Sequence, residues 1–403
     1  MKRTALFVAL LAIVASSCAS GSRSIVVGAM YPTRGGQGPG GIEEYRGVRL
    51  AADYVNTHGG VHGRSIRLDL VPADSSDAVP GAMRTLATHK ANVILGSYGS
   101  TMSASAARIA SRREVVFWET GAVGLLPQVA SGHVFRVPAT GETLGRVAVE
   151  FVRSELVPHG GRYGIAYVDD VYGRSVGMGA ARAVGSTAVM FPYSIRNTDF
   201  NALARKIKTS GVNVLVVGAY LEDGVALRRA LVAEHVSLRA NIGTSSSYCM
   251  PEFGAQLGAA AVGVFASDKP DADSIRPGVL SKGAEAELRW AQAEYRSRYH
   301  QEMQAPALTG FSGALALFAN VLPVAKDMSV SSIAQAAQRT TIPELGLPNG
   351  SGLAFSSYAG VSENARAASV IWEWVAPNER AIVWPPAFAT ARITGSGEMA
   401  APA

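Results

Sequence analysis

The sequence predicts an α/β fold with two lobes, each built on a doubly wound parallel sheet with helices on both faces. From Ser24 onward, short apolar runs alternate with segments of helical period, and this alternation starts again near Gly164. The chain has 403 residues, 48% hydrophobic and 17% charged, which is globular in composition and too long for one core. These observations predict two similar lobes in succession, with a cleft between them.

The first half opens with an apolar run at Ile25–Met30, which has the length of a buried strand. A helix is expected over Glu43–Asn56, where apolar residues share one face, and Gly59-Gly60 ends it. Alternation of this kind favours parallel pairing. The further elements expected here are strands at Ile66–Val71, Val93–Leu95 and Val115–Phe117, and helices at Ala78–Thr88 and Ser103–Arg112.

The second half repeats the pattern. The expected strands are Gly164–Val168, Val189–Pro192, Val212–Val217, Ala240–Gly243, Ala261–Val264, Val370–Trp374 and Ala381–Val383, and the expected helices are Gly173–Val184, Phe200–Thr209, Asp223–Ala233, Lys282–His300 and Ala305–Ala325. Within the last helix, Leu308–Ala325 is uncharged over 18 residues, which is long enough to be considered as a membrane span. Its polar residues and Pro323 favour a helix buried inside the protein instead.

The first residues have the order of a secretory signal. Met1–Arg3 is basic, Thr4–Ala15 is apolar, and small residues lead to Cys18. We therefore expect residues 1–17 to be a signal peptide and the protein to be extracytoplasmic, in the periplasm or at the cell surface. A small-residue run that stops at cysteine resembles a bacterial lipobox, which implies a lipid anchor on Cys18; a plain cleaved signal is the alternative.

Several classes of function are disfavoured. An exported protein has no supply of ATP or NAD, so we expect no cofactor. The net charge of +6 comes from scattered basic residues, which argues against a nucleic-acid partner. His58 and His62 are four residues apart, but Gly59-Gly60 breaks any helix that would align them, so no metal site is predicted. The motif H-E-x-x-H and the phosphate loop are absent, so we do not expect an enzyme.

The run Gly36–Gly41 satisfies G-x-G-x-x-G between a strand and a helix, which taken alone suggests a dinucleotide site. The long turn that starts at Tyr31, the missing N–H of Pro39 and the export signal weigh against that interpretation. Two interpretations remain, namely a mobile loop near the cleft and a flexible loop without a role.

The run Gly96–Thr101 follows the third expected strand and opens the third helix. Its hydroxyls, including those of Ser100 and Thr101, and its free backbone N–H groups lie at the positive end of that helix. This arrangement suits a carboxylate or another small anion, and the alternative is a helix cap without a ligand.

Two turns in the second half occupy equivalent positions. In Asp169–Gly173 the paired carboxylates suit general acid–base chemistry, but no nucleophile or histidine accompanies them, which favours turn and capping roles. In Gly218–Asp223, Tyr220 offers a ring and a hydroxyl, and the acids either receive a cation or cap the following helix.

Several short motifs occur in an order typical of one family. The most specific is Gly59–Arg64, which reads Gly-Gly-Val-His-Gly-Arg after a helix that ends near Asn56. The others are Gly47–Ala51, Tyr172-Gly173 and the Asp199-Phe200 turn. Together they resemble the type I periplasmic substrate-binding proteins of branched-chain amino acid ABC transporters, over nearly all of the mature chain.

The resemblance implies the periplasmic binding protein type I fold, in which two lobes joined by three crossings close around a small ligand. The first lobe is expected to comprise residues 24–138 and 270–347. The second lobe is expected to comprise residues 139–269 and 348–395.

The resemblance also implies the residues of a ligand site. Ser100 is expected to hold a ligand carboxylate, with Tyr98 facing the ligand side chain. Tyr172 is expected to close over the ligand from the second lobe, with Tyr220 beside it. The positions expected along the ligand backbone are Gly121, Ala122 and Val123.

Two departures from the family pattern concern a ligand ammonium group. Val123 stands where the family usually has threonine, and Ser245 lies where the second lobe usually supplies an acid. Because an unpaired buried ammonium is costly, either Glu119 or Asp169 supplies the counter-charge or the ligand lacks an amino group.

The sequence therefore predicts an extracytoplasmic solute-binding lipoprotein that delivers a small ligand to an ABC permease when its lobes close. The candidate ligands are amino acids, carboxylates, amides and urea-like compounds. The alternative is a ligand-sensing receptor that signals to a membrane partner.

Overall fold

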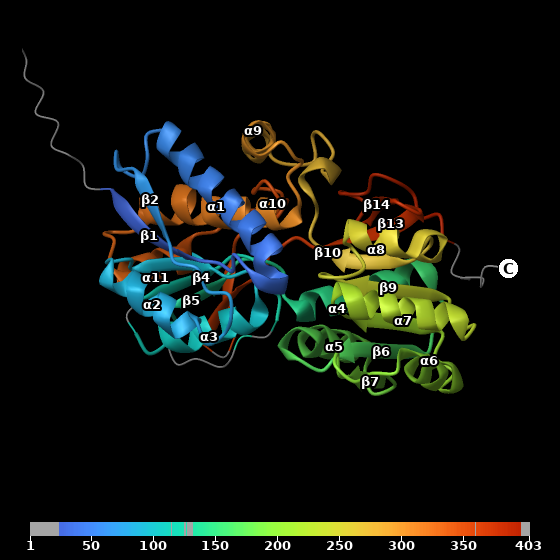
Figure 1. Ribbon diagram of the computed structural model, residues 1–403. Helices are drawn as coiled ribbons and strands as arrows, with labels where there is room; N and C mark the ends of the chain where they lie inside the picture. Colours follow the sequence, from blue (N-terminus) through green and yellow to red (C-terminus); the bar gives the residue numbers. More distant parts are fainter. Residues whose placement is uncertain (1–23, 114, 125, 127–131, 359, 396–403) are drawn as a thin grey trace, which may run out of the picture.

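The computed structural model describes residues 24–113, 115–124, 126, 132–358 and 360–395. The expected signal peptide and Cys18 lie outside these residues. The chain forms two α/β lobes that lie side by side (Figure 1), each with a sheet covered by helices on both faces. This arrangement confirms the predicted fold class.

The first sheet has seven strands among the described residues, in the order β11-β12-β5-β4-β3-β1-β2. All neighbours pair in parallel except β11 and β12, which form an antiparallel hairpin at one edge. The strands are β1 (Ile25–Met30), β2 (Ile66–Leu70), β3 (Val93–Gly96), β4 (Val116–Glu119), β5 (Val134–Arg136), β11 (Phe355–Tyr358) and β12 (Val361–Asn364).

The second sheet has the equivalent order β14-β13-β10-β9-β8-β6-β7. Here β13 is antiparallel to both of its neighbours, β10 and β14, and the other neighbours pair in parallel. Its strands are β6 (Tyr163–Val168), β7 (Val189–Tyr193), β8 (Val214–Gly218), β9 (Ala240–Thr244), β10 (Phe265–Asp268), β13 (Val370–Ala376) and β14 (Glu379–Trp384). In both lobes the central parallel strands are mainly apolar, because helices bury them on both faces, and their polar residues lie mostly at the carboxyl ends.

The helices begin where the sequence provides caps. The side chains of Thr140, Asp170, Asp199, Ser281 and Ser329 each accept a hydrogen bond from the backbone N–H three residues later. The helices of the first lobe are α1 (Gly38–Thr57), α2 (Val79–Thr88), α3 (Ser100–Ala110), α9 (Lys282–Tyr299), α10 (Ala305–Leu315) and α11 (Val330–Arg339). Those of the second lobe are α4 (Gly141–Phe151), α5 (Val171–Val184), α6 (Phe200–Thr209), α7 (Leu221–Ala233) and α8 (Pro251–Leu257).

Three segments of the described chain cross between the lobes: residues 137–140, residues 269–281 and residues 365–369. The third crossing follows β12, because β12 pairs with β5 and extends the first sheet. The expected division of the chain, which gave residues 348–395 to the second lobe, is therefore wrong for β11 and β12. Their pairing covers an edge of the first sheet that would otherwise be exposed.

One expected strand lies elsewhere in the structure. Ala261 ends a short 3-10 helix, and Gly263, with a φ of 78°, turns the chain before β10 begins at Phe265. The expected strand at Ala261–Val264 is therefore displaced by four residues, which moves its carboxyl end to Asp268.

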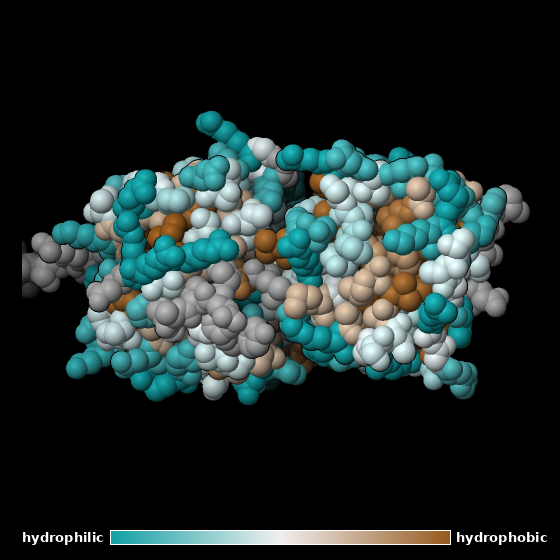
Figure 2. Space-filling view, turned by 90° about the horizontal axis from the view of Figure 1, so that it is seen from below, coloured by the Kyte–Doolittle hydropathy of each residue, from teal (hydrophilic) through white to brown (hydrophobic). Residues whose placement is uncertain are grey.

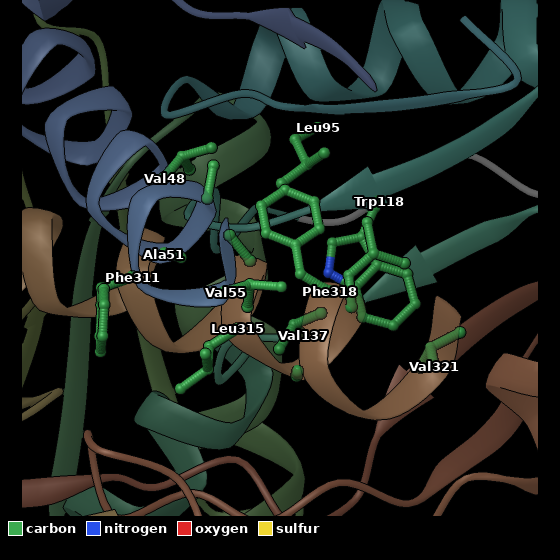
Figure 3. Packing of buried hydrophobic residues seen from close by; sticks show 14 of the residues in the cluster. Val48, Ala51, Val55, Leu95, Trp118, Val137, Phe311, Leu315, Phe318 and Val321 are labelled. Atoms are coloured by element: carbon green, nitrogen blue, oxygen red, sulfur yellow. The ribbon is translucent and has the colours of Figure 1, made fainter. Parts of the chain in front are cut away.

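The expected buried helix at Leu308–Ala325 is confirmed. The stretch Ala305–Val324 is long and apolar enough to span a membrane, but 78% of its most apolar window lies inside the first lobe. Figure 3 shows Phe318 beside Trp118, while Leu315 and Phe311 lie farther along the same helical stretch, on the side of α1. The indole N–H of Trp118 donates to the carbonyl of Gly313 at 2.9 Å, so the large ring is buried without an unpaired donor.

Seen from below, the two lobes are separate masses that meet across a narrow seam (Figure 2). Hydrophilic residues cover much of this face, and a few hydrophobic residues come to the surface at the seam.

The backbones of helices α1 and α10 contact each other at two glycines. A Cβ atom placed on Gly47 would lie 1.9 Å from the carbonyl oxygen of Ala307, and one on Gly310 would lie 2.2 Å from that of Glu44. These are backbone contacts that no side-chain rotation can relieve, so the two helices approach closely only because both positions lack a side chain.

Gly47→Ala is expected to lower the free energy of unfolding by about 3 kcal/mol, because α1 must move away from α10. Gly81→Ala is the matched control in α2, where a Cβ meets no atom within 4 Å. That change is expected to raise stability by up to about 1 kcal/mol through helix propensity. Urea unfolding followed by circular dichroism measures both, and equal stability of the two variants would contradict the close contact.

Candidate functional site

The candidate site lies where the carboxyl ends of the two parallel sheets face each other, which is the usual ligand position in open α/β sheets. Groups from the two sides meet there. The Lys269 ammonium donates to the carbonyl of Gly121 at 3.0 Å, and the Ser175 hydroxyl donates to that of Val123 at 3.4 Å. The expected residues Tyr98, Ser100 and Gly121–Val123 lie on the first lobe's side, and Tyr172, Tyr220 and Ser245 on the second lobe's side.

Ser100 and Thr101 form the first turn of α3, directly after β3 and its loop. The Ser100 hydroxyl oxygen accepts from the backbone N–H of Gly124 at 3.0 Å, which leaves its proton free to donate. Thr101 is exposed. The free N–H groups and the helix dipole make this turn suitable for an anion, in addition to any capping role.

Tyr98 is held in place by the glycine-rich run. A Cβ on Gly40 would lie 2.3 Å from Cζ of the Tyr98 ring, so the ring packs directly on the backbone of α1. Burial, assisted by the nearby Glu44 carboxyl, raises the pKa of the Tyr98 phenol. The run Gly36–Gly41 was expected to be a loop, but α1 already begins at Gly38 with Pro39 in its first turn.

Glu119 lies beneath the loop at Gly121 and Ala122. Its side chain is fully buried, and one carboxylate oxygen accepts from the backbone N–H groups of Gly121 and Ala122 at 2.9 and 2.5 Å. The Arg136 guanidinium lies 3.9 Å from the other oxygen. Burial raises the pKa of Glu119 to about 7, although Arg136 and the two N–H groups oppose the shift. Glu119 thus shapes the loop that carries the expected contacts.

Glu44, on α1, is a second buried acid under the same loop, and sequence reasoning missed it. Thr120 donates to one of its oxygens at 2.7 Å, while the other has no hydrogen-bond partner among the described residues. Burial, together with the negative charge of Glu119, raises the pKa of Glu44 to about 8. Its place within a run of polar residues on a helix gives no signal of burial, because that burial comes from contact with α10 and with Gly121.

In the second lobe, three strand ends bring two tyrosines together. The rings of Tyr172 and Tyr220 lie 5.1 Å apart at 42°, an arrangement favourable for aromatic pairs. The Tyr172 hydroxyl lies 3.0 Å from Oγ1 of Thr244 and donates to the carbonyl of Ser245. The Tyr220 hydroxyl donates to Asp170 at 2.7 Å. Both phenol hydroxyls are therefore hydrogen-bonded within their own lobe, and the Tyr172 ring is buried.

The Asp169–Gly173 turn has the predicted turn and capping roles. Asp170 caps α5 by accepting from the N–H of Gly173 at 2.9 Å. Asp169 is exposed and pairs with Arg174 at 2.6 Å. The structure therefore does not support Asp169 as the counter-charge for an ammonium group.

Asp268 and Lys269 also lie at this junction, and sequence reasoning missed them. They follow the true end of β10, which the expected strand at Ala261–Val264 did not reach. The two charges next to each other at a strand end were the available signal, since the other site residues occupy equivalent positions.

The raised pKa of Glu44 predicts how stability depends on pH. Folding raises this pKa from 4.5 to about 8, so the stabilising effect of the protonated carboxyl is present at low pH and is lost between these values as pH rises. Glu44→Gln keeps an acceptor for Thr120. The difference in unfolding free energy between this variant and the wild type is expected to shift in favour of the variant by about 3 kcal/mol from pH 5 to pH 8. Thermal unfolding at both pH values measures the effect.

Glu379→Gln, which changes an exposed carboxyl, serves as the control and is expected to leave the pH dependence unchanged. A Glu44→Gln protein that loses stability from pH 5 to pH 8 as steeply as the wild type would contradict a protonated Glu44.

Comparison with known proteins agrees with this architecture. The sequence model of the family described as "Periplasmic binding protein" matches residues 24–360. The Leu/Ile/Val-binding protein homolog 8 of Brucella abortus is 27% identical over 364 residues, which cover 86% of this chain and 87% of that protein.

Solved structures share the fold. The substrate-binding protein LivJ of Streptococcus pneumoniae, in complex with isoleucine, has a TM-score of 0.70 at 18% identity over 90% of this chain and 100% of that one. An extracellular ligand-binding receptor of Rhodopseudomonas palustris has a TM-score of 0.73 at 18% identity, covering 90% and 100%. With a family match over most of its length and two facing α/β lobes, the chain belongs to the periplasmic binding protein family.

Proposed function

We propose that this protein is an extracytoplasmic solute receptor that binds one small ligand between its lobes and presents the closed form to an ABC permease. The proposal rests on the different chemical groups that the two lobes offer across the seam, polar on one side and aromatic on the other. The first lobe offers the hydroxyl of Ser100 and the N-terminus of α3, while the second offers the rings of Tyr172 and Tyr220. A ligand with a carboxylate and an apolar part would contact both.

The ligand class follows from these groups and from the relatives. A carboxylate would accept from Ser100 and the N–H groups at the start of α3. Tyr98, Tyr172 and Tyr220 would enclose an aliphatic or aromatic body. The Brucella relative is named for leucine, isoleucine and valine, and the streptococcal structure holds isoleucine. We infer an amino-acid-like, carboxylate or amide ligand.

Closure provides the mechanism. Because the three crossings are the covalent links between the lobes, a rotation about them changes the distance between the two sheet edges. A ligand that contacts both edges only in the closed form shifts the population toward that form. A permease that recognises the closed shape then receives only loaded receptor.

We also propose that a lipid on Cys18 keeps the receptor at the membrane near its permease. The support is the order of basic, apolar and small residues before this cysteine. One acyl chain holds a protein only weakly, so firm anchoring would require further acylation of the same residue.

Ser100→Ala is expected to weaken binding by roughly 10- to 100-fold, the effect of losing one hydrogen bond to a charged group. Ser100→Ala combined with Tyr172→Ala is expected to abolish it. Ligands are first found by thermal shift with amino acids, carboxylates, amides and ureas, since a bound ligand raises the unfolding temperature. Titration calorimetry then measures the affinity of each variant.

Ser105→Ala on the same helix is the matched control, because the Ser105 hydroxyl donates to the carbonyl of Ser76 and lies beyond the first turn of α3. Unchanged affinity of the double variant would rule out this site.

Cys18→Ser is expected to prevent incorporation of a fatty acid and to release the protein from the membrane fraction. Metabolic labelling with an alkyne fatty acid measures incorporation, with Cys249→Ser as the control because that thiol is buried in the second lobe. Equal labelling of the wild type and the Cys18→Ser variant would contradict the proposed anchor.

A further inference from the structure

One buried carboxylate of the second lobe is not satisfied by the protein. Asp268 is the last residue of β10, next to the strand end that carries Thr244, and its exposed fraction is 6%. The Cys249 thiol donates to one of its oxygens at 2.7 Å. The other oxygen has no hydrogen-bond partner among the described residues. Buried polar atoms without partners are rare in folded proteins, and each requires an explanation.

No cation neutralises this carboxylate. Among the described residues, none with a positive side chain lies within ion-pair distance of Asp268, and two cations close to it in the fold, Lys269 and Arg380, contact other groups. The Lys269 ammonium donates to the carbonyl of Gly121 in the first lobe at 3.0 Å. Arg380 pairs with Asp271 and donates to the carbonyl of Cys249. An uncompensated charge in this position costs free energy that a positively charged ligand group would recover.

The negative charge of Asp268 affects titratable groups in both lobes. Burial is the main cause of the raised pKa values of Tyr98 in the first lobe and Tyr172 in the second, and the charge of Asp268 adds to both shifts. A group that contacts the free oxygen would therefore lie among the same residues that we propose as the ligand site.

Of the other acids near the seam, Asp223 is also buried with one oxygen unpartnered among the described residues, but unlike Asp268 it does not contribute to the raised pKa of Tyr98 in the first lobe. The remaining acids differ from Asp268 in their partners or their position. Both oxygens of Asp170 are bound, by Tyr220 and by the N–H of Gly173. Glu119 is occupied by backbone N–H groups and faces Arg136. Glu44 has one oxygen without a partner among the described residues, but that oxygen lies behind the loop at Gly121, where a Cβ on Gly121 would be 1.7 Å from it.

We propose that Asp268 receives the ammonium group, or an equivalent N–H donor, of the bound ligand, at the opposite end from the carboxylate held by Ser100. This inference rests on the proposed receptor function. It assigns the ligand to the amino acids rather than to the simple carboxylic acids. The acid missing at Thr244–Ser246 is then supplied by the neighbouring strand, one position along the same sheet edge.

Matched pairs of compounds test the assignment. L-Leucine and L-phenylalanine are compared with 4-methylpentanoate and 3-phenylpropanoate, which have the same carbon skeletons and carboxylate without the amino group. The wild-type protein is expected to bind the amino acid of at least one pair about tenfold or more tighter by calorimetry. This comparison needs no variant, so it does not depend on how a mutant folds.

Asp268→Asn keeps the shape and an acceptor for the Cys249 thiol but removes the charge. It is expected to bring the affinity ratio within each pair close to one, whereas Ser100→Ala is expected to weaken both members alike. Asp169→Asn, the same change at an exposed acid paired with Arg174, is expected to leave the ratio unchanged. A folded Asp268→Asn protein that still prefers the amino acid would overturn the proposal.

The outcomes separate this inference from the receptor function. If the wild type binds only amine-free compounds, or binds both members of each pair equally, the role of Asp268 is wrong and the receptor function stands. If it binds no amino acid, carboxylate, amide or urea, both proposals are wrong.

Discussion

The close packing of α1 on α10 is the contact on which the first lobe's half of the site depends. Gly47 and Gly310 bring the two backbones together, although they come from segments far apart in the sequence. The same approach places Gly40 against the ring of Tyr98 and buries Glu44 beneath the loop at Gly121. A binding surface on loops is thus held by a rigid helix pair, because loops alone cannot keep side chains in a fixed geometry.

Charge is distributed unevenly at the lobe junction. Most of its buried ions are paired or bound to the backbone, as Arg136 is to Glu119 and Arg380 is to Asp271. Pairing of this kind limits the cost of burial and holds the crossings in place. Asp268 is an exception, because one of its oxygens has no hydrogen-bond partner and no cation pairs with it among the described residues. A receptor that binds a charged ligand requires such an exception, because a carboxylate oxygen without a partner can accept a hydrogen bond from the ligand.

Local sequence patterns predicted some features well and misplaced others. The helix caps and the alternation of strands and helices follow from residues near in sequence, and Asp170 has its predicted capping role. The glycine-rich run at Gly36–Gly41 was misjudged as a loop, because its helical conformation depends on packing against Tyr98. The strand before Asp268 was misplaced by four residues, because apolar residues continue through the turn at Gly263.

The sequence by itself determined the α/β class, the repetition of two lobes and the family, since these depend on periodicity and on motifs of consecutive residues. It also located the turns that carry Ser100, Tyr172 and Tyr220 at the ends of strands. Only the tertiary structure decided that β11 and β12 return to the first sheet, that Glu44 is buried, and that one oxygen of Asp268 has no hydrogen-bond partner among the described residues. These features arise from contacts between segments tens to hundreds of residues apart, and local sequence patterns do not predict which of these segments come into contact.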